Sequence, residues 1–561
     1  MKSLIHEMKV LQAGSAPLVA GLCQEIKLSE IVNSMVRWDP KQCRLSPGTL
    51  IQALVINVLT AKQPLYRIEE FYKNQDTELL FGPGVTADAL NDDALGRALN
   101  KLAQAHPKRV YLQLALSAVK VHGIDVNSVH ADTTSKSVYG QYEDDDNLLK
   151  ITHGYSKDHR PDLKQFLYGL IVNHEGIPLC GELRDGNTSD KTWNHDVLEE
   201  LESLLPVAKG KCIYVADSAL VTKANLDLMA EKDIAFISRL PDTFGIGKEL
   251  KEWAFQENNW QNVGQLSPGS DKASYRIQET QREFLERNYR FVVIHSTSLD
   301  KRKEKALEGE VDKQRITLTR SAQELGKRDF FCEADAKEAL EIFTKENQGL
   351  YIAFTGEVIS HTVIERRPGR PKKGEVPESK TLYRANVTVG DIDQSALAEA
   401  KARASTFILV TSVLDKEVSA LEVLKEYKEQ TKVEQGFRFL KDPVYVDGIY
   451  VKNTERVVAL GYVFLMSLLI YTLLQRRVRN NLAAEKDPVL IPGKRKTHNP
   501  TGKAILDMLE GLTVIKVKTD QGVQRLLPEN QYDKNVIRLL HLAGFSEKVY
   551  CTALNSNATM A

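Results

Sequence analysis

Apolar residues in the first 120 or so positions recur with the spacing of amphipathic helices. In the stretch 92–106, for example, Leu95, Leu99 and Leu102 form one apolar stripe. We therefore predict a helical N-terminal domain at residues 1–122. Short helices with scattered Lys and Arg suit DNA binding, but a plain helical bundle would show the same pattern.

From about residue 123 the pattern changes to short apolar runs separated by amphipathic segments. Two apolar runs joined by Glu175 and Gly176 predict a β-hairpin, and the continuous apolar run at 211–220 predicts a buried strand. Amphipathic segments on both sides of that run predict helices. This alternation predicts the first part of a mixed α/β sheet at 123–240.

After residue 240 the alternation of strand and helix patterns stops, and it returns only at about residue 404. Residues 241–403 are polar and rich in charge, with strand-like pieces between, and predict a β-rich insertion. The α/β pattern returns at 404–482, where one long helix is expected from about 418 to 441. Residues 483–561 predict a C-terminal helical tail.

One apolar segment raises the question of a membrane. Residues 457–474 form an uncharged run of 18 residues, which is long enough for a transmembrane helix. A helix buried in a large core has the same composition. Because the run is at the lower length limit and contains Gly461, Ser467 and Thr472, we favour the buried helix and expect no membrane partner.

Composition narrows the class of protein. The 561 residues are 42% hydrophobic and 27% charged, which excludes a mostly disordered or fibrous chain. Lys+Arg and Asp+Glu are both 75, so the net charge is zero; a local basic surface for nucleic acid remains possible. The six cysteines are far apart and form no C-x-x-C pair, which predicts no zinc ribbon or disulfide framework and a cytoplasmic protein.

Three acidic residues are candidates for chemistry because of their places in the predicted elements. Asp132 and Asp217 end predicted strands, and Glu434 lies in the middle of the predicted long helix. A hard cation such as Mg²⁺ binds a few carboxylates and leaves room for water and phosphate oxygens. Most Asp residues after strands are caps or turn formers, however, so the three alone do not establish a site.

The long helix adds a second pattern. Tyr427, Gln430, Glu434 and Lys441 stand at offsets 0, 3, 7 and 14 and lie within about 60° of one another around a helix. A solvated face would more often carry Glu and Lys in i,i+4 pairs. We predict that the carboxylate binds a metal while Tyr427 and Lys441 contact phosphate oxygens.

These residues resemble the DDE transposases of bacterial insertion sequences, in the group marked by a Y-(2)-R-(3)-E-(6)-K signature. The sequence HADTTS around Asp132 and VADSAL around Asp217 are similar to the two catalytic Asp segments of that family. Segments 154–165 and 186–190 are also similar to segments between them. The signature Arg is Gln430 here; Gln can still hydrogen-bond a phosphate or base but carries no charge.

The resemblance implies a fold, a chemistry and partners. The fold is α/β, with a ribonuclease-H-like mixed sheet, flanking helices and a β-rich insertion before the catalytic Glu. Asp132, Asp217 and Glu434 would hold two Mg²⁺ ions, with Mn²⁺ as a substitute, and the enzyme would cut double-stranded DNA at the terminal inverted repeats and join 3′ ends to target DNA. A homodimer would act on paired ends, in a bacterial cytoplasm and on nucleoid DNA.

Two other readings share these residues. One is a metal-dependent nuclease of the same fold without strand transfer, and the other is a non-catalytic DNA-binding protein derived from a transposase. The complete acidic trio argues against the second.

Further DNA contacts are expected outside the long helix. Lys157 and Arg160 belong to a basic and aromatic set at 155–160 that suits a nucleic acid backbone. The stretch 366–373, with Arg370, resembles an AT-hook that lies in a narrow minor groove. A solvated loop explains the stretch 366–373 equally well, whereas for the set at 155–160 we favour DNA contact over a plain surface loop.

Overall fold

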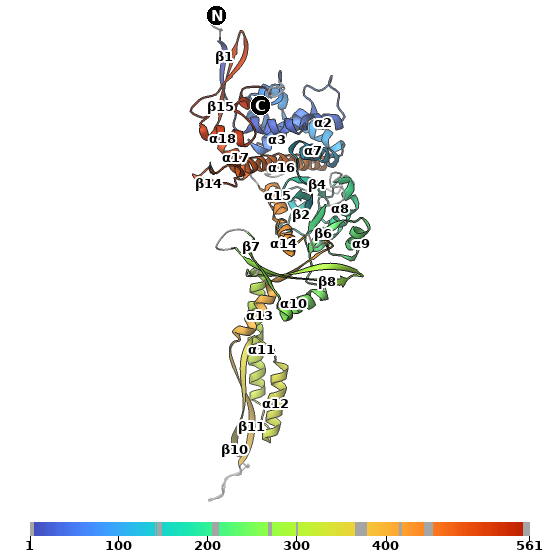
Figure 1. Cartoon of the computed structure of the whole chain (residues 1–561), viewed down its shortest axis with the longest axis vertical. Helices are drawn as coiled ribbons and strands as arrows, with labels where there is room; N and C mark the ends of the chain where they lie inside the picture. Colours follow the sequence, from blue (N-terminus) through green and yellow to red (C-terminus); the bar gives the residue numbers. More distant parts are fainter. Residues whose placement is uncertain are drawn as a thin grey trace. The chain divides into compact units, whose positions relative to one another are not determined.

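The computed structural model describes residues 5–140, 142, 149–204, 212–266, 272–298, 301–364, 379–414, 418–442 and 453–553. The chain forms two compact units (Figure 1). The first unit contains residues 1–239, 411–415 and 422–561, and the second unit contains 240–410 and 416–421. Arg370 lies outside the described residues.

The N-terminal part of the first unit is helical, as predicted, apart from its first element. Its helices are α1 (Ala16–Glu25), α2 (Leu28–Met35), α3 (Pro47–Leu59), α4 (Ile68–Lys73), α5 (Thr77–Phe81), α6 (Asp92–Gln104) and α7 (Pro107–His122). Residues 5–12 instead form strand β1 (Ile5–Gln12), which pairs antiparallel with a C-terminal strand. The helical prediction is wrong there because the partner strand is about 500 residues away in sequence and leaves no local signal.

The apolar segment 457–474 lies within α16 (Thr454–Ala483), and 89% of its most apolar window is buried inside the unit. Helix α16 packs against α1, α3, α6 and α7 on the N-terminal side and against β4 and α15 of the α/β part. Its length and composition would allow a membrane span, but its burial favours the predicted core helix.

A mixed sheet forms the centre of the α/β part. Its strands lie in the order β4-β3-β2-β5-β6. Their bounds are β2 (Ser128–Val138), β3 (Lys164–Asn173), β4 (Pro178–Arg184), β5 (Ile213–Ala216) and β6 (Ala235–Arg239), with helices α8 (Asp190–Leu204) and α9 (Lys223–Glu231) between them. Strands β2, β5 and β6 are parallel, and β3 and β4 form the predicted antiparallel hairpin, in which Gly176 has a φ of +86° that favours glycine.

The predicted long helix is two helices, α14 (Ala420–Lys428) and α15 (Thr431–Lys441). At the junction, Gln430 N–H donates to the carbonyl of Tyr427 and Val433 N–H to that of Gln430, so i→i−3 bonds replace the α-helical ladder. The single-helix prediction is wrong at this point, and Glu434 lies in the first turn of α15 rather than mid-helix. Local helix propensity runs unbroken through the junction, so the break has no sequence signal of its own.

The C-terminal segment, for which the sequence predicts short helices, also contains strands. Its elements are β13 (Val489–Ile491), β14 (Arg495–Thr497), α17 (Gly502–Leu509), β15 (Thr513–Thr519), β16 (Gly522–Leu526) and α18 (Lys534–Leu542). Strand β15 lies between β1 and β16 and joins the two ends of the chain in one small sheet.

The second unit contains a sheet in the order β12-β9-β8-β7 and a helix–hairpin arm. The sheet side comprises α10 (Gly245–Glu257), β7 (Gln261–Gln265), β8 (Ser274–Phe284), β9 (Arg287–Ser296), α13 (Gln394–Ala404) and β12 (Thr406–Thr411). The arm comprises α11 (Lys301–Gly326), α12 (Glu333–Glu346), β10 (Ile352–Ile364) and β11 (Ser379–Ile392). The predicted strand-like pieces are confirmed as β9, β10 and β11, but the charge-rich stretch between β9 and β10 contains the 26-residue helix α11.

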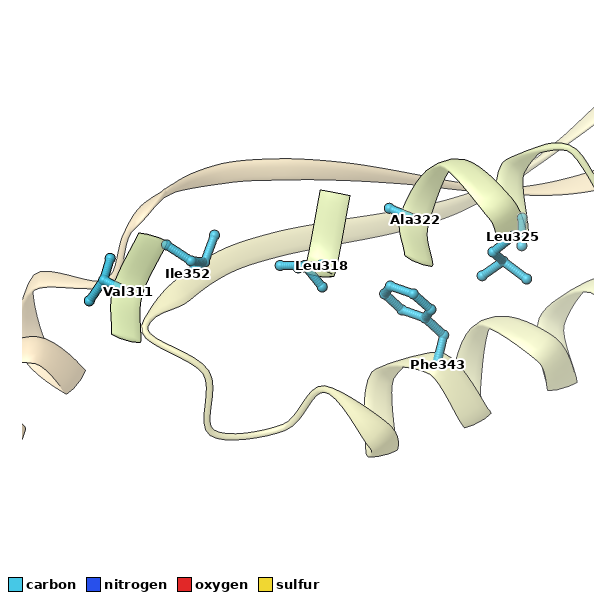
Figure 2. Packing of buried hydrophobic residues seen from close by; sticks show 7 residues of the cluster. Val311, Leu318, Ala322, Leu325, Phe343 and Ile352 are labelled. Atoms are coloured by element: carbon cyan, nitrogen blue, oxygen red, sulfur yellow. The ribbon is translucent and has the colours of Figure 1, made fainter. Parts of the chain in front are cut away.

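The arm has a core of its own, in which α11 and α12 pack on the hairpin of β10 and β11 (Figure 2). The buried side chains are all apolar: Val311, Leu318, Ala322, Leu325, Phe343, Ile352 and Ala385. In α11 they recur at helical spacing among charged residues, which explains how a polar sequence still forms a packed helix.

Candidate active site

The parallel pairing of β2 with β5 brings Asp132 and Asp217 together. The last residues that pair are Ala131 and Ala216, and each is followed directly by one of the two aspartates. Strand β2 continues to Val138 and beyond Ala131 pairs only with β3, so the prediction that the strand ends at Asp132 is wrong. The position relative to β5 is nevertheless that of a strand end, where ligands collect in α/β sheets.

Two side-chain contacts hold the α14–α15 segment against β2 at the two residues directly before Asp132. Nε2 of His130 lies 3.0 Å from Oε1 of Glu426, and Nε2 of Gln430 donates to the backbone carbonyl of Ala131 at 2.9 Å. The amide of Gln430 therefore faces the sheet in this structure, and its Oε1 is buried without a partner in the described part of the chain. Its predicted contact with DNA stays a prediction, and positioning Asp132 is a role that the sequence did not indicate.

Burial makes both aspartates hard to ionise. Burial raises the pKa of Asp132 to about 7; the Lys157 ammonium opposes this rise and Asp217 adds to it. Burial also raises the pKa of Asp217, against a hydrogen bond from the Ala219 amide. Both carboxylates lose water, and their negative charge is not fully neutralised by neighbouring groups. A bound cation would therefore stabilise their ionised forms.

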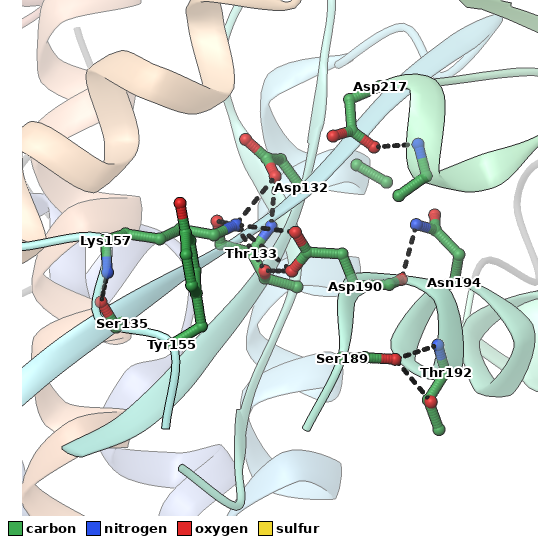
Figure 3. A network of polar contacts seen from close by, with 12 residues as sticks. Asp132, Thr133, Ser135, Tyr155, Lys157, Ser189, Asp190, Thr192, Asn194 and Asp217 are labelled. Atoms are coloured by element: carbon green, nitrogen blue, oxygen red, sulfur yellow. Dashed lines mark hydrogen bonds and ion pairs between the residues drawn. The ribbon is translucent and has the colours of Figure 1, made fainter. Parts of the chain in front are cut away.

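A fourth acidic residue, Asp190, joins this cluster through Lys157 and Thr133 (Figure 3). The Lys157 ammonium lies 3.8 Å from Asp132, 3.1 Å from Asp190 and 2.8 Å from the carbonyl of Thr133. The Thr133 hydroxyl donates to Asp190, which also raises the pKa of both aspartates. Asp190 ends the run 186–190 that resembles the transposase family, and that resemblance was the one available signal for it.

Glu434 and Asp132 line the same cleft, a cavity of about 680 Å³. Asp132, Asp217 and Glu434 each raise the pKa of Tyr427, after burial, and the result is about 12. The three predicted carboxylates thus act electrostatically on the same phenol. Among the described residues, no three His, Cys, Asp or Glu side chains lie close enough to hold one ion together.

Two of the residues predicted to contact DNA, Lys441 and Arg160, form ion pairs with aspartates. Lys441 lines the cleft and lies 2.5 Å from Asp158, the residue next to Lys157. Arg160 is exposed and makes two hydrogen bonds of 2.8 and 2.7 Å to Asp162. Two neighbouring residues therefore each place an opposite charge beside a candidate functional group. The Lys157 ammonium lies beside Asp132, and the Asp158 carboxylate pairs with Lys441.

Two family models match parts of the chain. A family model described as "Transposase DDE domain" matches residues 131–470, and one described as "Domain of unknown function (DUF4277)" matches residues 8–116. No curated protein matches the chain.

Proposed function

The chain belongs to the DDE transposase family, and on that premise we propose that it binds the ends of an insertion sequence, cuts the DNA there and joins the 3′ ends to target DNA. The observation that carries the proposal is the meeting of Asp132 and Asp217 where the parallel pairing of β2 with β5 ends, beside the cleft that Glu434 lines. The strand order β4-β3-β2-β5-β6 supports a ribonuclease-H-like catalytic domain.

The residues of the cleft fit the divalent ions that the family uses. In this proposal Asp132, Asp217 and Glu434 hold two Mg²⁺ ions, or Mn²⁺ in their place. Mg²⁺ is often bound by one or two carboxylates plus water and phosphate oxygens, so three carboxylates need not share one ion. When bound, the ions activate the attacking water and stabilise the leaving oxygen.

Side chains around the carboxylates would then orient the DNA. Tyr427 and Lys441 would contact phosphates at the cut, and Lys157 and Arg160 would follow the backbone next to it. Lys441 can do this only by exchanging Asp158 for a phosphate, because the two side chains are paired in the free protein. Gln430 would act through the backbone of β2 as well as through any contact with DNA. Arg370 is proposed as a minor-groove contact on its sequence alone.

Substitution of the carboxylates tests the proposal. Asp132→Asn, Asp217→Asn and Glu434→Gln should each lower cleavage of a plasmid that carries the element by about three orders of magnitude or more, because each removes a charge that acts on the reacting phosphate. Binding to the element ends, measured by gel shift without divalent ions, should change little.

Asp487→Asn is the matched control, since Asp487 is an exposed carboxylate in the same unit that does not line the cleft. If all three active-site variants cut as well as this control, the assignment is wrong. Joined products in the same assay distinguish a transposase from a nuclease that only cuts.

A further inference from the structure

A second cavity lies beside the cleft along α15. Its volume is about 500 Å³, and its lining comes from α15, α16 and the segment that leads into α17. We call it the back pocket. Arg438 and Asp442 line both this pocket and the catalytic cleft, so the two cavities are neighbours within the first unit.

The back pocket carries an excess of positive charge. Four cationic side chains line it: Lys432, Arg438, Arg479 and Lys503. Two carboxylates, Glu175 and Asp442, also line it, but Glu175 is already paired at 2.7 Å with Arg476, which is not part of the lining. Lys432 lies 3.5 Å from the exposed Glu429. The remaining charge favours an anion.

Arg479 is the cation held most firmly. Its Nε donates to the carbonyl of Pro500 at 2.8 Å, which fixes the direction of the guanidinium, and in the described part of the chain no carboxylate pairs with it. Burial lowers the pKa of Arg479 below its usual value. A partly desolvated guanidinium without a counter-ion gains from an anionic ligand, and its planar donors suit a phosphate.

One wall of the pocket is aromatic and rigid. The ring of Tyr471 packs on Phe439 with centroids 5.0 Å apart, and the Tyr471 hydroxyl accepts a hydrogen bond from the Lys503 amide. A Cβ at Gly502 would lie 2.6 Å from the Tyr471 ring, so glycine allows this close approach. The exposed amide of Gln435 supplies donors and an acceptor at the mouth.

We propose that the back pocket binds a phosphate-bearing nucleotide, with the cations on the phosphate and the amide and aromatic wall beside the base. The volume falls within the range of about 300–1,000 Å³ that is usual for small-molecule sites. Two sources share this chemistry, a nucleotide of the DNA that passes the cleft and a free nucleotide. The first source rests on the proposed function, whereas anion binding itself follows from the charges of the pocket.

The test uses the full chain without divalent ions, so that no cleavage occurs. The two probes are a fluorescent 30-base-pair duplex, read by anisotropy, and deoxyadenosine monophosphate, read by calorimetry. Lys503→Glu is the main variant because Lys503 is exposed and its loss leaves no buried gap. Lys486→Glu is the control, with the same charge change at an exposed lysine outside the pocket.

With the duplex, Lys503→Glu should weaken binding about tenfold and lower the salt slope by about one, against less than twofold for Lys486→Glu. That result assigns the pocket to DNA. Loss of monophosphate binding in Lys503→Glu alone, with unchanged duplex binding, assigns it to a free nucleotide. Equal effects of the two variants on both probes overturn the inference.

The outcome is separable from that of the proposed function. If Lys503→Glu weakens duplex binding but Asp132→Asn still cuts, the pocket stands and the catalytic assignment fails. If the two lysine variants behave alike while Asp132→Asn is inactive, the pocket fails and the catalytic assignment stands. Arg479→Gln serves as a second pocket variant, with circular dichroism to show that it is folded.

Discussion

The cleft takes carboxylates partly out of water, whereas the core of the arm of the second unit buries hydrocarbon side chains. Asp132 is partly buried next to Asp217, with the Lys157 ammonium as its neighbouring cation. The core of the arm, around Leu318 and Phe343, contains apolar residues alone. The first arrangement costs stability and the second supplies it.

The cleft and the arm differ in whether the groups that they remove from water are charged. The cleft keeps charges that are only partly compensated in the free protein, where Lys157 lies beside Asp132 and Asp158 pairs with Lys441. In the proposed function these charges would receive cations and phosphates. In the described part of the arm the buried core is apolar, and it packs two helices on a hairpin. Substitutions in the two regions should therefore move stability in opposite directions.

The largest expected effect is in the arm. Leu318→Ala removes a fully buried side chain from α11 and should lower the free energy of unfolding of the arm by about 2–5 kcal/mol. Hydrogen exchange of the α11 amides measures this. Ile316→Ala, two residues away and 70% exposed, is the control and should change stability by less than about 0.5 kcal/mol. Equal losses at the two positions would show that the core is not where the structure places it.

In the cleft, Asp132→Asn should stabilise the metal-free protein by about 1–3 kcal/mol at pH 8, because it removes a buried charge. The pKa of Asp132 is raised from 3.8 to about 7, so the folded protein holds this proton more tightly than the unfolded chain. Its contribution to stability is complete below about pH 4 and is lost as the pH rises through 7.

Urea unfolding in EDTA between pH 4 and 8 checks the sign. The free energy of unfolding should fall with rising pH in the wild type, and it should fall less in Asp132→Asn. Added Mg²⁺ should stabilise the wild type more than the variant. A variant that is less stable than the wild type at pH 8 would contradict the comparison of cleft and arm.

A smaller effect is expected from Lys157→Met. Removing the ammonium 3.8 Å from Asp132 leaves the carboxylates free for a divalent ion, so Mn²⁺ should bind about tenfold more tightly. Calorimetry of Mn²⁺ binding measures this directly. Lys191→Met, next to Asp190 in sequence but exposed, is the matched control and should leave the affinity unchanged. Weaker Mn²⁺ binding in Lys157→Met would show that the lysine supports the metal site instead of competing with it.

The smallest effect is expected from Asp158→Asn. This change frees Lys441 from its ion pair, and binding of duplex DNA should become about three- to fivefold tighter, with a steeper dependence on salt. Anisotropy at several salt concentrations measures both. Asp487→Asn should not alter the affinity; if Asp158→Asn binds no more tightly than this control, Asp158 does not compete with DNA for Lys441.

Much of the fold follows from local pattern. The N-terminal helices, the hairpin at Gly176, the buried strand β5 and the core helix α16 are confirmed, because each has a clear period or an unbroken apolar run. The elements that the sequence predicted wrongly depend instead on contacts between distant parts of the chain. Strand β1 depends on a partner at the far end of the chain, and the break between α14 and α15 accompanies a contact of Gln430 with β2. The catalytic roles and the domain boundaries inferred from the sequence stay predictions.

The sequence by itself determined which residues are candidates for the chemistry, because their types, their elements and their resemblance to a family can be recognised one segment at a time. Only the tertiary structure decided what those residues face. It brings Asp190 and Lys157 to Asp132, turns Gln430 toward the sheet, pairs Lys441 with Asp158 and opens a basic pocket beside the cleft. These contacts join segments up to about 300 residues apart, and charge and burial act through space and not along the chain.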